Sequence, residues 1–166
     1  MEYISSDTNV WIDFSKISKL KTPFLLDCTY IMFNDAIEDE LLSPKGLKEE
    51  LLALGLRGVT ITTSEYYYAD EMGSRYPRLS KYDRIALAIA KKRNITLLTG
   101  DLALRKAAIS ENVIVMGTIG LLDRLLTEQK IDEREYVECI SAFLDYNGSG
   151  IRLPEEELRR RLDKGR

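Results

Sequence analysis

The sequence predicts a single α/β domain with a mostly parallel central sheet flanked by helices. Short apolar runs rich in β-branched residues alternate with longer segments of helical periodicity, which is the pattern of such sheets. The 166 residues suit one domain, and 45% hydrophobic with 31% charged residues is ordinary for a folded chain. No repeat, linker or low-complexity tract interrupts the sequence, so the elements are expected to share one core.

The first half of the chain predicts three strands and three helices. Strands are expected at residues 3–6, 30–33 and 59–63, and helices at residues 9–17, 35–42 and 45–54. Val10, Phe14 and Ile17 fall on one face of the first helix, as expected for a helix packed on a core. Gly55 and Gly58 mark the end of the third helix, and a β-branched run follows them.

The second half predicts two more strands and a series of helices. Helices are expected at residues 80–93, 102–109, 119–128, 132–144 and 155–164, and strands at residues 95–99 and 113–116. Asn147 to Gly150 predict a turn, and Pro154 begins the last helix, whose acids precede its arginines as the helix macrodipole favours. We therefore expect a domain over residues 1–146 and a charged helical tail over residues 147–166, packed on the domain or extending from it.

Composition excludes several classes of protein. Lys and Arg number 24 against 27 Asp and Glu, a net charge of −3, which excludes a strongly basic coat for nucleic acid but allows a local basic patch. The absence of histidine removes Ser-His and Cys-His nucleophile pairs and imidazole ligands for zinc. Cys28 and Cys139 are too far apart for a Cys-x-x-Cys site. With no apolar run of membrane-spanning length and no secretory pattern, we expect a cytoplasmic protein without membrane partners.

Acidic residues follow the predicted strands where a ligand site is expected. Asp7 comes after the first strand, Asp101 after the fourth, Asp83 lies in the first turn of the helix at residues 80–93, and Glu38 to Glu40 lie after the second strand. In a parallel sheet the carboxyl ends of the strands meet at one edge, where ligands bind. Carboxylates crowded there without offsetting cations repel one another, and a divalent cation removes that cost. Oxygen ligands alone favour Mg²⁺ or Mn²⁺ over zinc.

Each acid also has a purely structural interpretation. Asp7 and Asp101 could cap the helices that follow them. Ser80 and Asp83 fit a capping box, and Glu38 to Glu40 could form a solvated helix face.

The acidic segments together resemble those of PIN domains. The similarity lies in Ser6 to Asp13, in Asp83 before the apolar run at residues 86–90, and in residues 98–108, with residues 113–122 similar to the last strand and helix of that family. It extends from about residue 3 to residue 126, and the later helices resemble those of some uncharacterised or toxin-type members. The resemblance implies a single three-layer PIN-like domain over residues 1–146 with extra C-terminal helices, and a Mg²⁺- or Mn²⁺-dependent ribonuclease activity.

The resemblance also implies roles for single residues. The first acid of the family falls on Asp7, the third on Asp83 and the fourth on Asp101, and together with a second acid they would hold one or two ions for phosphodiester hydrolysis. Asn9 and Thr99 would orient water or ligands around these ions. Because Leu102 to Leu104 follow Asp101, where some members carry a further acid, the number of ions stays open.

The second acid is less well defined. In the family it precedes an apolar residue, which indicates Glu40 before Leu41. If Ile37 and Leu41 face the core, Asp39 points away, whereas Glu38 and Glu40 flank the core-facing side, and helical geometry does not choose between them.

Basic residues near Asp83 are candidates for RNA contact. They are Arg75, Arg78, Lys81 and Arg84, interleaved with Tyr76 and Tyr82, and Arg105 four residues after Asp101. Cations bind backbone phosphates and exposed tyrosines stack on bases, although such charges are also common on solvated helix faces. Arg105 could instead form a helical salt bridge with Asp101.

Two functions remain open at this point. The first is a PIN-type ribonuclease that cleaves RNA. Such a protein could be the toxin of a toxin–antitoxin pair, with an inhibitor protein filling its acidic pocket, and it could form a homodimer. The alternative is a non-catalytic PIN-like module that binds RNA or a protein, against which the mutual repulsion of the acids argues. A phosphotransfer enzyme of the haloacid-dehalogenase type fits poorly, since Asp7-Thr8-Asn9 lacks a second aspartate. A receiver also fits poorly, since Ser5-Ser6 rather than acids precede Asp7.

Overall fold

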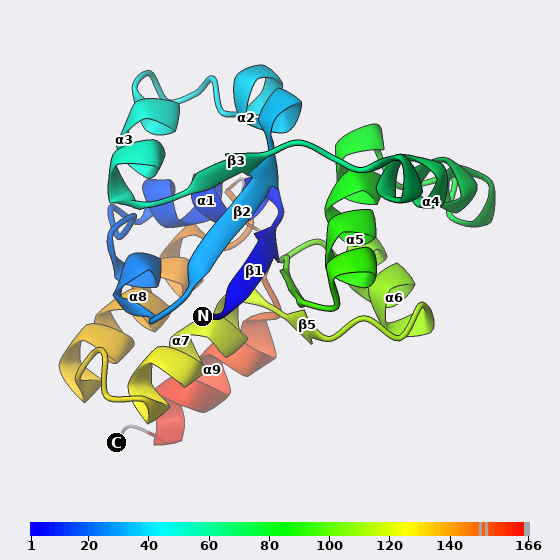
Figure 1. Ribbon diagram of the computed structural model, residues 1–166. Coiled ribbons are helices and arrows are strands. Elements are labelled where there is room, and N and C mark those ends of the chain that lie inside the picture. Colours follow the sequence, from blue (N-terminus) through cyan, green and yellow to red (C-terminus); the bar gives the residue numbers. More distant parts are fainter. Residues whose placement is uncertain (150, 152, 165–166) are drawn as a thin grey trace.

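The computed structural model describes residues 1–149, 151 and 153–164, and its centre is a five-stranded sheet in which every pairing is parallel (Figure 1). The strands are β1 (Tyr3–Ser6), β2 (Thr29–Phe33), β3 (Arg57–Val59), β4 (Thr96–Leu98) and β5 (Val115–Met116), in the spatial order β3-β2-β1-β4-β5. The chain builds outward from β1 on one side and then returns to add β4 and β5 on the other. The strand order therefore reverses between β1 and β4, the usual position of a ligand site in such sheets.

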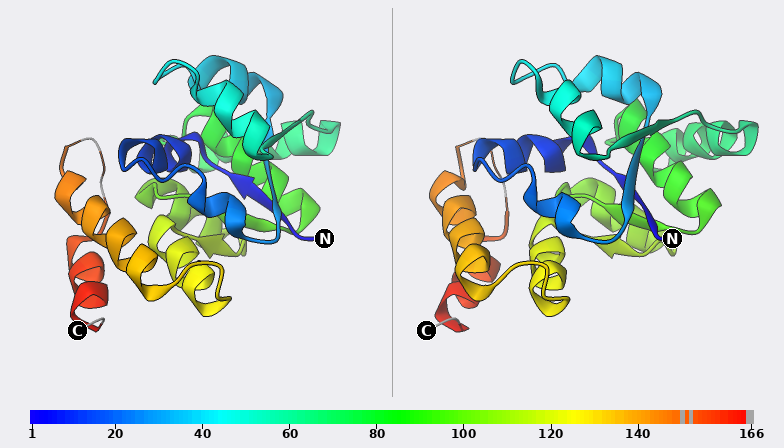
Figure 2. Two further views of the ribbon diagram at one scale, coloured as in Figure 1. Left: turned by 90° about the vertical axis from the view of Figure 1, so that its left-hand side faces the viewer. Right: turned by 60° about the vertical axis from the view of Figure 1, so that its left-hand side comes forward.

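Helices cover both faces of the sheet and confirm the predicted three-layer fold (Figures 1 and 2). One face carries α1 (Thr8–Lys16), the 3₁₀ turn η1 (Thr22–Leu25), α2 (Asn34–Glu40), α3 (Leu47–Leu54), α7 (Thr118–Thr127), α8 (Glu133–Tyr146) and α9 (Glu155–Lys164). The other carries α4 (Thr63–Arg75), α5 (Lys81–Arg93) and α6 (Leu102–Ser110). Alternate strand residues serve the two layers: Ile4 and Leu98 pack toward α1 and α7, and Leu97 toward α5 and α6.

The sequence prediction was wrong over residues 59–63. The strand there ends at Val59, and Thr63 already belongs to α4, a helix that the prediction missed. The β-branched run resembles a strand, but the Thr62 hydroxyl accepts a hydrogen bond from the Glu65 N–H and the Glu65 carboxylate accepts one from the Thr62 N–H. This capping box begins the helix, so local hydrogen bonding outweighs β-propensity. The other predicted elements begin and end within two residues of their observed bounds, whereas η1 was not predicted.

The C-terminal segment shares the core of the domain. Leu153 and Leu158 are buried in the same cluster as the residues of α8, beside which α9 lies in Figure 2. Arg161 forms an ion pair with Asp123 at 2.7 Å, and Arg159, Arg160 and Arg161 all pair with glutamates of their own helix. Gly150 of the predicted turn and residues 152, 165 and 166 of the predicted tail lie outside the described residues.

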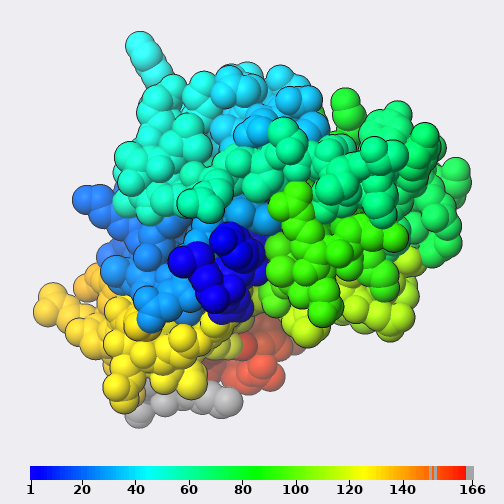
Figure 3. Space-filling view, viewed as in Figure 1, coloured from blue at the N-terminus to red at the C-terminus, as the bar shows by residue number. Residues whose placement is uncertain are grey.

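The two ends of β1 differ in exposure. The first residues of the chain are at the surface in the space-filling view, where they are dark blue (Figure 3). Ser6 and Asp7 at the carboxyl end are buried. In the described part of the chain, no helix has the length and apolarity that crossing a bilayer requires.

Glu65 joins the start of α4 to the end of α5. Its side chain is buried, forms an ion pair with Arg93 at 2.8 Å and accepts the Thr62 N–H at 2.8 Å. Burial alone would raise the pKa of Glu65, but the hydrogen bonds from Arg93 and Thr62 hold it below its usual value. The carboxylate therefore contributes to stability as a charged, fully bonded group.

Removal of this carboxylate tests its role. We expect Glu65→Ala to lower the free energy of unfolding by about 2–4 kcal/mol, because it removes a helix cap and leaves the Arg93 guanidinium without its partner. Urea denaturation measures the change. Glu71→Ala, which removes an exposed carboxylate of the same helix, is expected to cost less than about 0.5 kcal/mol. Equal losses in the two variants would contradict the assignment.

Candidate active site

Thr99 connects the two acids at the reversal of the sheet. Its hydroxyl donates a hydrogen bond to Asp7 Oδ2 at 2.9 Å and accepts one from the Asp101 N–H at 3.0 Å. Asp7 in turn donates its N–H to the Leu98 carbonyl at 2.9 Å, which continues the pairing of β1 with β4. The carboxyl ends of these two strands therefore bring Asp7 and Asp101 to the same edge, as their sequence positions predicted.

Asp7 is a buried carboxylate, with 5% of its surface exposed. Burial and then the negative charge of Asp83 raise its pKa to about 7, although the hydrogen bond from Thr99 opposes the shift. Asp7 occupies the N-cap position of α1, where the N–H of Asn9 in the first turn also lowers its pKa.

Asp83 and Asp101 do cap helices. Asp83 and Ser80 form a full capping box at the start of α5, and Asp101 Oδ1 accepts the Leu104 N–H of α6 at 2.8 Å. Burial raises the pKa of Asp83, as does the charge of Asp101, against the hydrogen bonds from Ser80. Each carboxylate keeps one oxygen, Asp83 Oδ1 or Asp101 Oδ2, for which the described structure gives no hydrogen bond. Capping and ligand binding are therefore compatible for both acids.

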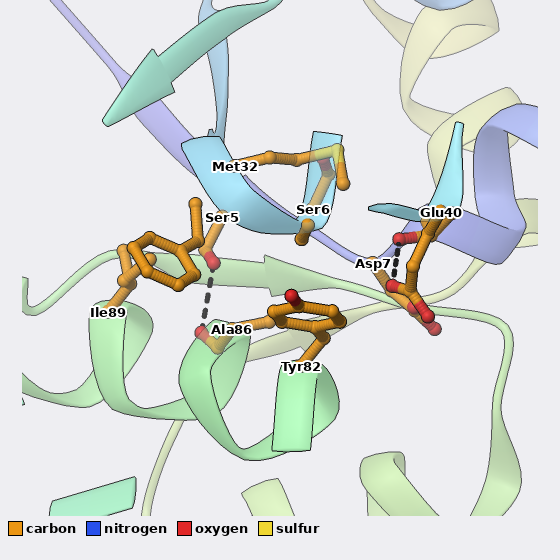
Figure 4. A pocket seen from close by; sticks show the side chains of 11 residues that line it. Ser5, Ser6, Asp7, Met32, Glu40, Tyr82, Ala86 and Ile89 are labelled. Atoms are coloured by element: carbon orange, nitrogen blue, oxygen red, sulfur yellow. Dashed lines mark hydrogen bonds between the residues drawn. The ribbon is translucent and has the colours of Figure 1, made fainter. Parts of the chain in front are cut away.

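The three consecutive acids at the end of α2 face different partners. Glu40 accepts a hydrogen bond from the Thr8 hydroxyl at 2.8 Å, while Glu38 pairs with Lys48 at 3.2 Å and Asp39 accepts the Tyr82 hydroxyl. Glu40 and Asp7 line the same small pocket, in which Figure 4 shows them side by side with Tyr82 nearby. Its cavity of about 10 Å³ has room for about one water molecule. Helical geometry alone could not choose between Glu38 and Glu40. The contacts with Thr8 and Lys48 place Glu40, rather than Glu38, beside Asp7.

The chemistry of these side chains, rather than their spacing in this structure, suits a divalent cation. Within the described residues, no Lys or Arg lies within salt-bridge distance of Asp7, Asp83, Asp101 or Glu40, so their charges lack a protein counter-ion. No three acidic or cysteine side chains of these residues converge into a ready ligand cluster, because the caps hold Asp83 and Asp101 toward their own helices. The donors are all oxygens, the ligands that Mg²⁺ and Mn²⁺ prefer.

The basic residues predicted to contact RNA have different surroundings in the fold. Arg75 pairs with Glu71 and Glu111, and Arg84 donates to the Ala69 carbonyl between α4 and α5, so both serve the packing of this layer. Lys81 lies over the Tyr82 ring at 5.6 Å. Arg78 and Arg105 are exposed, and the described structure gives Arg105 no salt bridge with Asp101.

Other polar residues near the acids had not been singled out by the sequence. Thr8 holds Glu40, and the Ser5 hydroxyl donates to the Ala86 carbonyl at 2.9 Å, which ties β1 to α5. The sequence feature that could have indicated these residues is a run of small hydroxyl residues at the end of a buried strand, since buried hydroxyls need hydrogen-bond partners. Asn9, expected to support the ions, is exposed in the first turn of α1.

Comparison with known proteins identifies the family. The sequence model of a family described as a PIN domain matches residues 3–165, so the chain belongs to the PIN-domain family and the predicted resemblance is confirmed. Proteins with this domain are generally nucleases and typically use divalent metals. No curated protein and no solved structure matches the chain significantly.

The pKa of Asp7 makes stability depend on pH. The folded-state pKa of about 7 lies above the unfolded value of about 3.9, so the contribution of Asp7 is complete below pH about 4 and is lost as the pH rises through 7. In EDTA, we expect the stability of Asp7→Asn relative to wild type to increase by about 2 kcal/mol between pH 5 and pH 8.5. Urea denaturation at both pH values measures this. Asp145→Asn, the same change at an exposed site, is expected to show no such trend, and a flat difference for Asp7→Asn would refute the assignment.

Proposed function

We propose that this PIN domain is a Mg²⁺- or Mn²⁺-dependent ribonuclease. The observation that carries the proposal is the buried carboxylate of Asp7, linked through Thr99 to Asp101 and raised in pKa by burial and by Asp83, with no cation of the described chain beside it. A folded protein that keeps such repulsion in its interior loses stability by it, and a bound cation offsets the loss. This favours a catalytic site over a binding module, in which the repulsion would serve no purpose.

Four carboxylates would hold the ion: Asp7, Asp83, Asp101 and Glu40. When bound, a divalent ion supplies positive charge to the phosphodiester group and lowers the pKa of water. Asp7 loses its proton when it becomes a ligand, so binding is expected to weaken below pH 7. Thr99 fixes the orientation of Asp7, Thr8 fixes that of Glu40, and the caps at Ser80 and Leu104 fix Asp83 and Asp101.

A nuclease assay with isosteric variants tests the proposal. We expect wild-type protein to cleave a mixed RNA pool with Mn²⁺ or Mg²⁺ and not with EDTA, and Asp7→Asn and Asp101→Asn to reduce the rate about 10²-fold or more, because each removes a ligand charge. Mn²⁺ should raise the melting temperature of wild type but not that of Asp7→Asn.

Asp145→Asn serves as the matched control and should cleave at the wild-type rate, since its side chain is exposed at the end of α8. Cleavage that survives both active-site substitutions would refute this site. A wild-type protein that neither cleaves RNA nor responds to Mn²⁺ would contradict the ribonuclease and favour the binding module.

Glu40 and Glu38 form a matched pair for the second acid. Glu40→Gln should lower the cleavage rate about 10–100-fold, because Thr8 holds this carboxylate at the pocket of Asp7, whereas Glu38→Gln should change it less than about twofold. Initial rates at saturating Mn²⁺ measure the difference. The reverse order of the two effects would assign the role to Glu38.

A further inference from the structure

A cavity of about 760 Å³ lies between α6 and α9, and the start of α7 forms part of its lining. It is separate from the small pocket that Asp7 and Glu40 share. Its volume falls within the range of small-ligand pockets, about 300–1,000 Å³. Its apolar lining is Leu102, Val115, Met116, Ile119, Leu153 and Pro154. The cavity therefore has room for a small organic molecule with an apolar part.

The first turn of α7 presents main-chain N–H groups to this cavity. Gly117 is the N-cap of the helix and has no side chain with which to cap it. The first hydrogen bond of the helix runs from the Leu121 N–H to the Gly117 carbonyl at 2.9 Å, so the N–H groups of residues 118–120 have no acceptor within the helix. Residues 117–120 all line the cavity. With the positive end of the helix dipole, they favour a bound anion.

The Thr118 hydroxyl is an independent indication of a ligand. Thr118 is 1% exposed, and its Oγ1 has no hydrogen-bond partner in the described part of the chain. The hydroxyl lies next to Gly100, another lining residue, because a Cβ placed on Gly100 would be 3.2 Å from Thr118 Oγ1. Buried hydroxyl groups almost always have a hydrogen-bond partner, so this one indicates a group that binds at the same place.

Arg105 brings a positive charge to the same end of α7. A Cβ placed on Gly117 would be 3.1 Å from Arg105 Nη1, so the guanidinium lies against the N-cap of this helix. Within the described residues, Arg105 forms no ion pair. The guanidinium and the positive end of the helix repel each other, and an anion bound between them removes that cost.

The other charges that line the cavity do not provide this anion. Glu157 is neutralised by ion pairs with Arg160 and Arg161 of its own helix. Asp101 also lines the cavity, but its Oδ1 caps α6 rather than α7. An incoming anion is therefore favoured at Gly117 and disfavoured next to Asp101.

We propose that this cavity binds a small organic phosphate monoester, with the phosphate group at the start of α7. The N–H groups of residues 118–120, the Thr118 hydroxyl and Arg105 donate hydrogen bonds to the phosphate oxygens, and the apolar part of the ligand packs on Ile119 and Leu153. A monoester carries about two negative charges at neutral pH, which match the two positive groups at this end of the helix. A backbone diester of RNA carries one. The ligand is therefore distinct from the substrate of the proposed ribonuclease and goes beyond that function.

NMR titrations of the metal-free protein with three phosphates test the proposal. We expect phenyl phosphate to shift the amide signals of residues 118–120 until they saturate. Inorganic phosphate keeps the charge but lacks the ring, and methyl phenyl phosphate keeps the ring but is a diester with one charge. Each should bind about tenfold more weakly than phenyl phosphate, because each loses one of the two contacts. If the diester binds as tightly as the monoester, or if the signals of residues 118–120 do not shift, the proposal is wrong.

Substitutions at the two side chains locate the site. Arg105→Gln and Thr118→Val should each weaken the binding of phenyl phosphate about tenfold. Thr118→Val should leave the midpoint of urea denaturation unchanged or higher, because the hydroxyl that it removes has no partner in the described structure. Lys106→Gln is the matched control, since this exposed neighbour of Arg105 lines a different cavity and loses the same charge.

We expect Lys106→Gln to bind phenyl phosphate as wild type does. Equal weakening in Arg105→Gln and Lys106→Gln would reduce the effect to overall charge and overturn the proposal. Wild-type affinity in Arg105→Gln would also overturn it, and this exposed substitution is informative even if Thr118→Val folds poorly. Because the titrations contain neither metal nor RNA, a failure of the ribonuclease proposal leaves their result intact.

Discussion

The parallel pairing of β1 with β4 is the contact on which the site depends. It brings Thr99 within hydrogen-bond distance of Asp7, a residue 92 positions earlier in the chain. The bond from Ser5 to Ala86 then fixes α5 against β1, and with it the turn that carries Asp83. Three acids from three distant segments are therefore positioned by main-chain pairing and a few hydroxyl groups.

In the same arrangement, the negative charge that a metal ligand needs lowers the stability of the fold. The interior around Asp7 is less stable with a charged carboxylate than with a neutral one, and the raised pKa expresses that cost. The caps formed by Asp83 and Asp101 offset part of this loss of stability, since each satisfies a helix N–H that would otherwise lack a partner. The structural and functional interpretations of these two residues are therefore compatible, because a carboxylate has two oxygens and a cap uses only one.

Periodicity and strand-end position were sufficient to predict the layers, the sheet direction and the acids of the family motifs. They were insufficient at α4, where hydroxyl capping decided between helix and strand, although Thr62 and Glu65 have the spacing of a capping box. Nor could they choose Glu40 over Glu38, since that choice depends on Thr8 and Lys48, which belong to other elements. The roles of Arg75 and Arg84 could not be predicted from the sequence either, because their partners are set by the packing of α4 on α5 and α6.

The distribution of ion pairs determines where this acidic chain keeps positive charge at its surface. Many of its cations, including Arg93, Arg124 and Arg161, are neutralised within the fold and contribute no field beyond it. The field at the surface is therefore set by the cations that the fold leaves without partners. Around α6, within the part of the chain that the structure describes, Arg105 and Lys106 form no ion pair, and each lines a surface cavity. Because screening limits their influence to about 10 Å at 0.1 M salt, their nearness to Asp101 matters more than the net charge of the protein.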